Sequence, residues 1–429
     1  MTPIVADTSD SDICPHRNLA QRIASNLVHS ATPAIASLGL LASGVAQAQM
    51  GGLDYTVDTT VDSLAADGFC SLREAIEVVS NPGAPRADCV GVPNMAVSDQ
   101  ILFDASISGQ TITLGGTQLP NILRSVSIIG PVEGDPSSIT IDADNRSRVM
   151  RSYGYLTPAD VQLSNLTLTN GNTGSNMNGG GIETLYGSLT LTDCVVTGNT
   201  AGRSGGGIFG NYDVRLERTL VSDNRLAANS NGGGGLFVSG NLYANNSIIS
   251  GNSAPANIAP GNFGHGGGAS VFGNTSLNRT VISGNITGGE GANGGGLYAQ
   301  GNVIAYYSAI TDNITSGNQA HGGGIFVDGY GGGNDLILFS TVVSGNEVQG
   351  AGSHGGGVFF DGVRGSSRLS VQSTTIADNR ATGRGGGVYA RYSNHYNSRS
   401  SISYSTISGN EANDGGGIFA TYAYLDVTN

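Results

Sequence analysis

The chain has 429 residues, of which 69 are Gly and none is Trp, and its formal net charge is −13. Hydrophobic residues make up 38 % of it, which is too many for a disordered Gly-rich chain. All 19 basic residues are Arg, and the excess of 32 acidic residues makes nucleic acid and anionic membranes poor partners, so we expect no nucleic-acid partner.

The first 48 residues have the pattern of an export signal. Arg17 and Arg22 precede a modestly apolar run, residues 31–46, and Ala46-Gln47-Ala48 fits a small-residue cleavage site. A disordered tail is the alternative, because acidic residues are unusual ahead of a signal. We expect residues 1–48 to be a signal peptide. The mature segment has no run of the ~18 apolar residues that a transmembrane helix needs.

Residues 68–79 carry the one clear helix signal, because Ser71 followed by Glu74 makes a capping box. One face of this helix is apolar: Leu72, Ala75, Ile76 and Val79. We expect the helix to cover the open end of a repetitive fold, whose unpaired strand edges would otherwise recruit another chain. In an exported chain, Cys70 and Cys89 are candidates for a disulfide that closes a small loop.

Two motifs recur out of phase through the rest of the chain. Nine Gly triplets, each followed by an apolar residue, end at Gly181, Gly207, Gly235, Gly268, Gly296, Gly324, Gly357, Gly387 and Gly417. A Ser/Thr/Ala–Gly/Asp–Asn triad ends at Asn199, Asn224, Asn252, Asn285, Asn313, Asn346, Asn379 and Asn410. Three residues before each of these Asn residues stands Val or Ile, a β-branched type that favours strand over helix. Such regular self-similarity predicts stacked repeats.

The repeats predict an all-β fold, a right-handed parallel β-helix (solenoid) with a short N-terminal capping helix. Equivalent positions of successive coils should stack at about 4.8 Å. We expect the Asn column to occupy left-handed turn positions and to bond amide to amide between coils. We expect a cap over residues 49–105 and the β-helix over residues 106–429. Because the sequence stops inside a coil, we also expect the β-helix to be truncated at its C-terminal end.

The hexapeptide Cys70-Ser71-Leu72-Arg73-Glu74-Ala75 resembles the signature of the CSLREA domain, an N-terminal module of exported bacterial β-helix proteins. The likeness continues through residues 99–104, 109–114 and 164–172. The repeats are similar to those of polymorphic outer membrane proteins, although Gly-Gly-Gly stands here for the family's Gly-Gly-Ala and the Asn-ended triads lack its Phe. The resemblance implies the fold, export and a surface or extracellular location, and it supplies no catalytic residues.

Two pairs on neighbouring coils are candidates for chemistry. His321 and His354 each precede a Gly triplet and could hold a transition metal, although zinc takes three or four ligands; the alternative is a water-facing turn position, and we expect no metal. Asp328 and Asp361 form a pair of stacked carboxylates, which is the starting point for the active site of a glycosidase or a calcium-dependent lyase. Arg364 is the nearest strong base, since the chain has no Lys. A turn Asp before Gly is the commoner explanation of each carboxylate.

The second residue after each triplet is aromatic in seven of the nine repeats: Phe209, Phe237, Tyr298, Phe326, Phe359, Tyr389 and Phe419. The residues on either side of it are aliphatic or small. If these neighbours face the core, strand alternation points the rings outward, where they suit stacking on sugars or on a protein partner. The alternatives are that loops cover the rings or that the rings face inward.

These features favour a non-catalytic, adhesin-like or structural binding rod. We expect it to be secreted or at the cell surface, associated with the outer membrane, with glycans or a host or neighbouring-cell surface protein as partners. A carbohydrate-active enzyme, either a polysaccharide lyase or a glycoside hydrolase, is the alternative, and it rests on fold analogy alone. We expect no cofactor.

Overall fold

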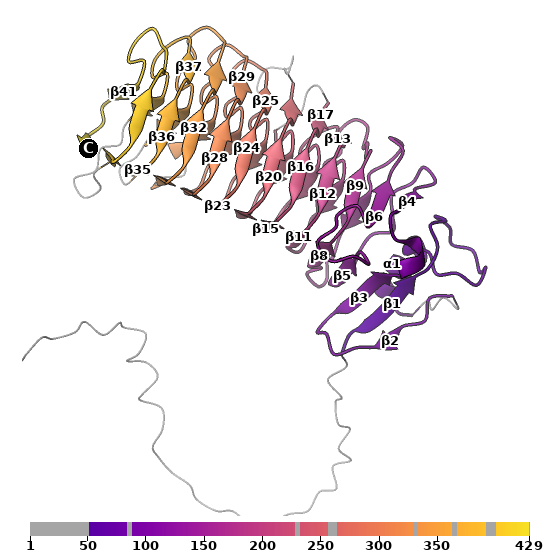
Figure 1. The fold of residues 1–429 in the computed structure, drawn as a ribbon. Coiled ribbons are helices and arrows are strands. Elements are labelled where there is room, and N and C mark those ends of the chain that lie inside the picture. Colours follow the sequence, from indigo (N-terminus) through magenta and orange to yellow (C-terminus); the bar gives the residue numbers. More distant parts are fainter. Residues whose placement is uncertain are drawn as a thin grey trace, which may run out of the picture. The chain divides into compact units, whose positions relative to one another are not determined.

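The chain winds into successive coils, and the strands of each coil pair with the equivalent strands of the coils before and after it. The computed structural model describes residues 51–83, 88–227, 232–255, 264–329, 333–362, 367–391 and 400–428. The predicted signal peptide, residues 1–48, lies outside these ranges. Figure 1 shows the coils following one another in chain order, from indigo to yellow.

Four sheets run along the stack. In order, sheet A contains β2 (Val92–Pro93), β1 (Leu53–Val57), β3 (Asp99–Phe103), β5 (Val126–Ile129), β8 (Val161–Ser164), β11 (Leu189–Thr192), β15 (Val214–Glu217), β19 (Leu242–Asn245), β23 (Thr275–Asn278), β27 (Val303–Tyr306), β31 (Leu336–Phe339), β35 (Leu369–Gln372), β39 (Ser400–Ser403) and β42 (Leu425–Thr428). Sheet B contains β4 (Gln110–Thr113), β6 (Ile139–Asp142), β9 (Thr167–Thr169), β12 (Val195–Thr197), β16 (Leu220–Ser222), β20 (Ile248–Ser250), β24 (Val281–Ser283), β28 (Ala309–Thr311), β32 (Val342–Ser344), β36 (Thr375–Ala377) and β40 (Thr406–Ser408).

Sheet C holds the strands that follow the Gly triplets, preceded by β7 (Met150–Ser152): β10 (Ile182–Thr184), β14 (Ile208–Gly210), β18 (Leu236–Val238), β22 (Ala269–Val271), β26 (Leu297–Ala299), β30 (Ile325–Val327), β34 (Val358–Asp361), β38 (Val388–Arg391) and β41 (Ile418–Thr421). Sheet D consists of two-residue strands: β13 (Thr200–Ala201), β17 (Arg225–Leu226), β21 (Ser253–Ala254), β25 (Ile286–Thr287), β29 (Ile314–Thr315), β33 (Glu347–Val348) and β37 (Arg380–Ala381). Among the described strands only β1 and β2 pair antiparallel. The chain therefore passes through sheets C, A, B and D in turn.

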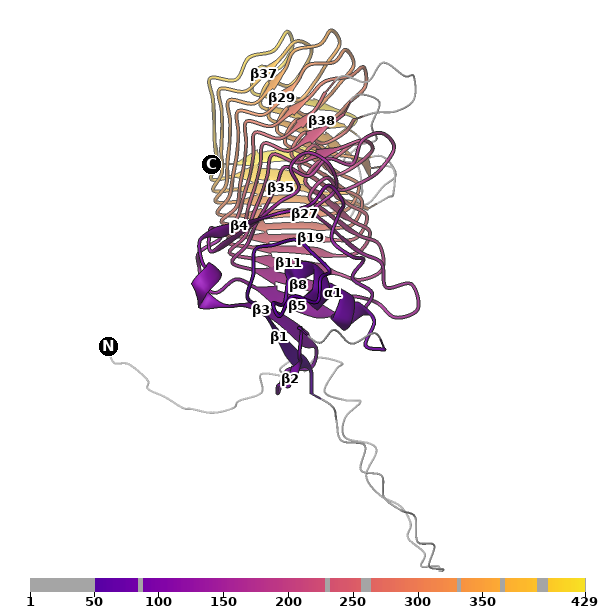
Figure 2. The ribbon, with the colours of Figure 1, turned by 90° about the vertical axis from the view of Figure 1, so that its right-hand side faces the viewer.

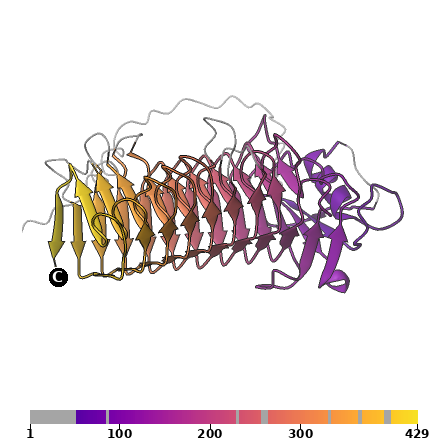
Figure 3. The ribbon, with the colours of Figure 1, turned by 90° about the horizontal axis from the view of Figure 1, so that it is seen from above.

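The register places equivalent repeat positions side by side. Val196 pairs with Val221, which pairs with Ile249 on the next coil, and all three side chains are fully buried. Seen in Figure 2, strands of sheet A lie in one row, and Figure 3 shows the same stacking from above. The predicted all-β parallel β-helix is confirmed.

The asparagine column forms a buried ladder through the stack. Asn313 donates its Nδ2 hydrogens to the Ile282 carbonyl and to Asn346 Oδ1, both at 2.9 Å, while its own Oδ1 accepts from Asn285 Nδ2 at 2.9 Å. The predicted amide-to-amide bonding is confirmed, but the predicted left-handed backbone at Asn is wrong. The residue before Asn makes that turn, so that the amide can point inward: Gly198, Asp223, Gly251, Gly284, Asp312, Gly345, Asp378 and Gly409.

Each glycine of a triplet has its own steric reason, as the triplet before β14 shows. Gly205 adopts a left-handed conformation, with φ of 66°. A Cβ on Gly206 would overlap the Gly234 carbonyl of the next coil, and one on Gly207 would lie 2.8 Å from the Asn224 amide carbon. Alanine therefore does not fit the third position, because the asparagine ladder packs against it.

A second left-handed column lies between sheets A and B, and it contains no glycine. Its φ values fall between 46° and 52°, which most side chains adopt only at a cost of about 1 kcal/mol. The residue that follows each member points into the coil, as Thr219 does with 1 % of its surface exposed. The column itself lies on the edge where the two sheets meet: Asp193, Arg218, Asn246, Arg279, Tyr307, Ser340, Ser373 and Tyr404.

Helix α1 (Leu72–Ser80) packs against β1 and β3 at the N-terminal end of the stack, and a 3₁₀ turn, η2 (Ala105–Ile107), follows β3. The predicted capping box is present, with Glu74 reaching back to the Ser71 backbone. All four residues of the predicted apolar face are buried. Strands β1 and β3 come from the predicted cap and belong to sheet A, so the cap continues directly into the coils. Among the described residues, no helix is long and apolar enough to cross a membrane.

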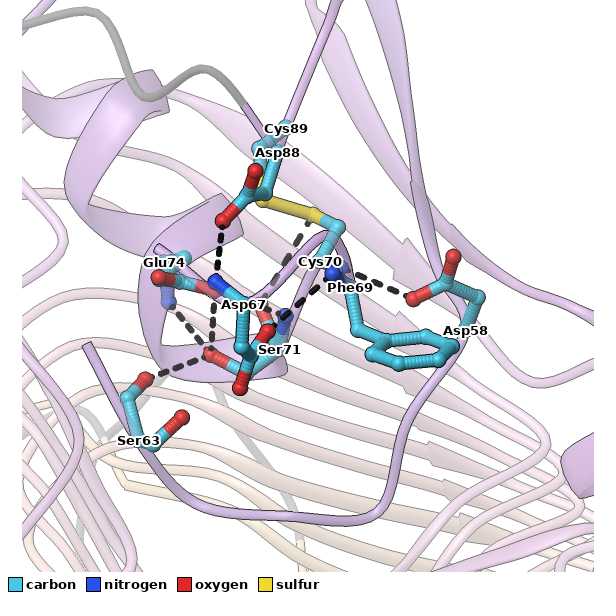
Figure 4. Close-up of a disulfide and its surroundings, with 9 residues drawn as sticks. All are labelled: Asp58, Ser63, Asp67, Phe69, Cys70, Ser71, Glu74, Asp88 and Cys89. Carbon is cyan, nitrogen blue, oxygen red and sulfur yellow. Dashed lines mark hydrogen bonds between the residues drawn. A yellow bond between two sulfur atoms is a disulfide. The ribbon is translucent and has the colours of Figure 1, made fainter. Parts of the chain in front are cut away.

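The residues of the hexapeptide hold this end of the stack together. Cys70 forms a disulfide with Cys89, as Figure 4 shows, and its backbone N–H donates to Asp58 at 2.8 Å. Arg73 pairs with Asp62 at 2.7 Å and donates to the carbonyls of Thr117 and Gln118, both at 2.9 Å. These contacts tie the helix to the first coils, so each polar residue of the motif has a structural partner.

Candidate functional site

The aromatic column lies on the outer face of sheet C, outside the main core. Its neighbours Leu297, Ala299, Val358 and Phe360 belong to that core and are fully buried. Parallel rings stack from coil to coil with centroids 4.8–5.5 Å apart, from Tyr298 through Phe326, Phe359 and Tyr389 to Phe419. Ser270 interrupts the column, and Phe209 and Phe237 stack separately at 5.2 Å.

The column is nevertheless covered, so the prediction of an exposed row of rings is wrong. Phe209, Tyr298, Phe326, Phe359 and Tyr389 expose between 1 % and 8 % of their surface, while Phe237 and Phe419 are half-buried. The physical reason is that the residue before a Gly triplet lies over a ring in four repeats, as His265, His321, His354 and Arg384 do. Because a buried ring cannot stack on a sugar or on a protein, the column stabilises the coils instead of forming a binding surface.

The covering residues include three imidazoles, which continue the ring stacking. His265 stacks on Tyr298 at 4.3 Å, His321 on Phe359 at 4.7 Å and His354 on Tyr389 at 5.0 Å. Burial lowers the pKa of His265 to about 4. Burial and the positive charges of neighbouring groups lower the pKa of His321 to about 3 and depress that of His354. These side chains are therefore neutral at neutral pH.

His321 and His354, the candidate metal ligands, do lie together, with ring centroids 5.1 Å apart. His321 Nδ1 accepts the His354 backbone N–H at 3.1 Å, and His354 Nδ1 accepts that of Arg384 at 3.0 Å. Each ring is thus left with Nε2 as a protonated donor. Across the described ranges, no group of three or more His, Cys, Asp or Glu side chains is arranged to hold a metal ion.

Asp328 and Asp361 stand at the ends of neighbouring strands of sheet C, beside the ring column. Asp328 accepts a hydrogen bond from the Tyr298 hydroxyl at 2.8 Å. Asp361 is 4 % exposed, its Oδ2 pairs with Arg391 on the next coil, and its buried Oδ1 has no hydrogen-bond partner within the described ranges. Arg364 lies outside the described residues. The cation next to Asp361 is therefore Arg391, which the sequence did not single out.

This carboxylate row coincides with a change in the connections between sheets C and A. The connection after β26 comprises residues 300–302. Those after β30, β34 and β38 comprise residues 328–335, 362–368 and 392–399, so three consecutive coils carry insertions at the strand ends where Asp328, Asp361 and Arg391 lie. The coincidence makes this row a candidate site.

A second candidate lies on the edge between sheets A and B and was missed by the sequence reasoning. We call it the edge cluster: Arg279, Tyr306, Tyr307 and Phe339, from three consecutive coils. Phe339 packs edge-on against Tyr306 at 5.9 Å and Tyr307 at 5.8 Å, and the Arg279 guanidinium lies 5.7 Å from the Tyr307 ring centre. The two tyrosines are 40 % and 55 % exposed. A Tyr pair just before Ser308, with aromatic or basic residues one coil away, is the signal that would have found it.

A cleft of about 520 Å³ opens near the cap, between the turns at residues 117–118, 145–148 and 172–177. Arg148, which lines it, donates to Gln118 at 2.7 Å and pairs with Glu183 at 3.0 Å. Burial lowers the pKa of the Arg148 guanidinium. Glu183 acts in the opposite direction. The Arg148 guanidinium also donates to backbone carbonyls, so this cation helps to hold the coils together.

Cys194 points into the stack and is 1 % exposed. Burial raises the pKa of its thiol to about 12, so the reactive thiolate does not form at neutral pH.

No protein-family model matches the chain, and no curated protein and no solved structure is significantly similar to it. The fold therefore rests on the strand pairing described above.

Proposed function

We propose that this is an exported bacterial surface or extracellular protein of the CSLREA and polymorphic-outer-membrane-protein kind, which acts as a non-catalytic, adhesin-like binding rod. The observation that carries the proposal is the pair of buried ladders. Asparagine amides join the coils from Asn199 to Asn410, and stacked rings join those from Tyr298 to Phe419, so outward side chains keep fixed positions in rows. A rigid display of rows suits multivalent contact with a glycan or a surface protein.

The location is tested by fractionating cells that express the full chain and by measuring the mass of the purified product. Export predicts a chain that begins at Gln49 and is found outside the cytoplasm, at the outer membrane or in the medium. An uncleaved chain retained in the cytoplasm would contradict the proposal. A variant with Ala46→Leu and Ala48→Leu is the control, because it removes the small residues that a signal peptidase reads.

A carbohydrate-active enzyme is the second candidate, and one observation favours it. The buried Oδ1 of Asp361 has no hydrogen-bond partner among the described residues and is able to accept a hydroxyl hydrogen or a proton, and Asp328 lies on the adjacent coil. The test is release of reducing ends or unsaturated products from acidic polysaccharides, with and without calcium. Turnover that is abolished by Asp361→Asn would overturn the non-catalytic proposal. Binding without turnover would support it.

A further inference from the structure

The edge cluster combines exposed aromatic rings with a cation, Arg279, that has no counter-ion among the described residues. Arg279 follows the last strand residue of β23 and is exposed. Tyr307 occupies the equivalent left-handed position one coil later, and Tyr306 and Phe339 are register partners at the ends of β27 and β31. All four side chains are therefore fixed by backbone that is paired on both sides.

The Arg279 guanidinium has no acidic partner among the described residues. Arg218, which lies two coils earlier in the same column, pairs with Asp193 at 2.7 Å and with Glu217 at 2.9 Å. Arg215 lies over the Tyr243 ring at 4.2 Å, and it too has a carboxylate nearby, Asp213 at 3.6 Å. Within the described part of the chain, Tyr307 is the ring that lies against the Arg279 guanidinium. When the face of a guanidinium lies against a ring, the N–H donors at the edge of the guanidinium stay free and fit a planar carboxylate.

The rings beside Arg279 favour a sugar as the carrier of that carboxylate. Tyr306 and Tyr307 expose about half of their surface, and Tyr combines an apolar ring face with a hydroxyl that bonds to polar ligands. The left-handed column continues on both sides of the cluster with Asn246 and Ser340, which place hydrogen-bonding side chains at one-coil intervals. A linear, hydroxyl-rich polymer can follow such a row, whereas an apolar protein surface would leave the polar groups of the row unpaired.

We propose that the edge cluster binds an acidic polysaccharide through one uronate residue. The uronate carboxylate pairs with Arg279, the pyranose ring stacks on the exposed Tyr306 and Tyr307, and neighbouring sugars contact the polar side chains of the left-handed column. This inference rests on the proposed binding function and names its ligand class. The charge of −13 on the whole chain opposes polyanion binding at long range, so the attraction is local and is weakened by salt.

The test compares polygalacturonate with its fully methyl-esterified form, which keeps the ring and removes the charge. Isothermal titration of the purified mature chain should show about tenfold weaker binding to the ester, because the charged hydrogen bonds to Arg279 are lost. Arg279→Gln should bind both polymers equally and weakly. The matched control is Arg215→Gln, which alters a ring-stacked arginine that already has a carboxylate partner and should leave the preference unchanged. Tyr306→Ala with Tyr307→Ala should weaken binding to both polymers.

Four outcomes would overturn the inference. Equal affinity of the unaltered chain for the two polymers would show that the charge is not read, and an unchanged preference in Arg279→Gln would place the site elsewhere. Binding of neither polymer, or equally tight binding of poly-aspartate, would exclude a uronate polymer as the ligand. The fractionation experiment gives its answer independently of these measurements, so failure of the ligand assignment is distinguishable from failure of the surface-protein proposal. Circular dichroism of each variant checks that the fold is retained.

Discussion

The buried imidazoles make the stack sensitive to acid at a pH where carboxylates are still ionised. His265 and His321 are held neutral by burial, with pKa values of about 4 and about 3, whereas an exposed His in the unfolded chain has a pKa of about 6.5. At a pH between the folded and the unfolded pKa values, these His residues are protonated in the unfolded chain and neutral in the folded chain. The contribution of the two rings to stability is therefore complete above pH 6.5 and is lost as the pH falls toward 3 to 4.

The magnitude follows from the difference in proton binding. At pH 5 the solution lies about 1.5 pH units below the pKa of an unfolded His. Protonation therefore stabilises the unfolded chain by about 2 kcal/mol for each ring that is buried and neutral in the folded chain. The two rings together lower the free energy of unfolding by about 4 kcal/mol between pH 8 and pH 5. His354 adds to this in the same direction, since its pKa is also lowered by burial and by Arg384 and Arg391. Such a loss is a large part of the 5–15 kcal/mol by which proteins are stable.

The variant His321→Asn separates this effect from other acid effects. Asn293 occupies the same column one coil earlier, and its Oδ1 accepts the His321 backbone N–H at 2.8 Å, so asparagine can replace the acceptor that His321 provides for His354. The variant loses the ring contact with Phe359, which costs about 1 kcal/mol at every pH. It has no group to titrate, so its stability should fall by about 2 kcal/mol less than that of the unaltered chain between pH 8 and pH 5.

Urea unfolding followed by far-ultraviolet circular dichroism at pH 8 and pH 5 measures this difference. The double variant with His265→Asn and His321→Asn should be nearly insensitive to pH in this window, apart from the contribution of His354. If His321→Asn loses as much stability on acidification as the unaltered chain, the imidazole is not the acid-sensitive group and the reasoning is refuted.

Three variants test other contacts. Asn313→Ala removes a ladder residue and leaves the buried backbone N–H and one side-chain N–H of Asn285 without their acceptor, so the free energy of unfolding should fall by about 3 kcal/mol in urea titration; a loss below about 1 kcal/mol would contradict the ladder. Phe326→Ala opens a cavity in the buried ring column and should cost about 3–5 kcal/mol while leaving glycan binding of the folded fraction unchanged. Cys70→Ser with Cys89→Ser opens a loop of about 20 residues and should cost about 3 kcal/mol, measured as a lower melting temperature that reductant no longer changes.

The sequence predicted the features that recur from coil to coil. The Asn triads, the β-branched positions and the capping box at Ser71 were each read correctly because they depend on local spacing and on register. The left-handed turn was placed one residue late. The residue before Asn is Gly in five of the eight triads and Asp in the other three, and both residue types tolerate that conformation, while the Asn amide needs its inward partners.

The environment of the outer face of sheet C could not be predicted in the same way. Strand alternation predicts whether the Phe359 side chain points away from the core, but not whether a neighbouring segment covers it. The residue before each triplet reads as a polar turn position, and His321 looks like a water-facing residue until the turn is seen to fold over the ring. The edge cluster was missed for the opposite reason. Its members were treated as variable surface residues, although Tyr306 and Phe339 occupy the same position on successive coils.

The left-handed edge between sheets A and B separates two requirements that most surface positions combine. The constraint there falls on the main chain alone, and residues as different as Asp193, Arg279, Tyr307 and Ser340 satisfy it. Each coil thus has one position on this edge whose side chain can be exchanged without repacking the interior. Recombination or point mutation along this line would change the side chains that the proposed binding function uses, while the underlying architecture persists.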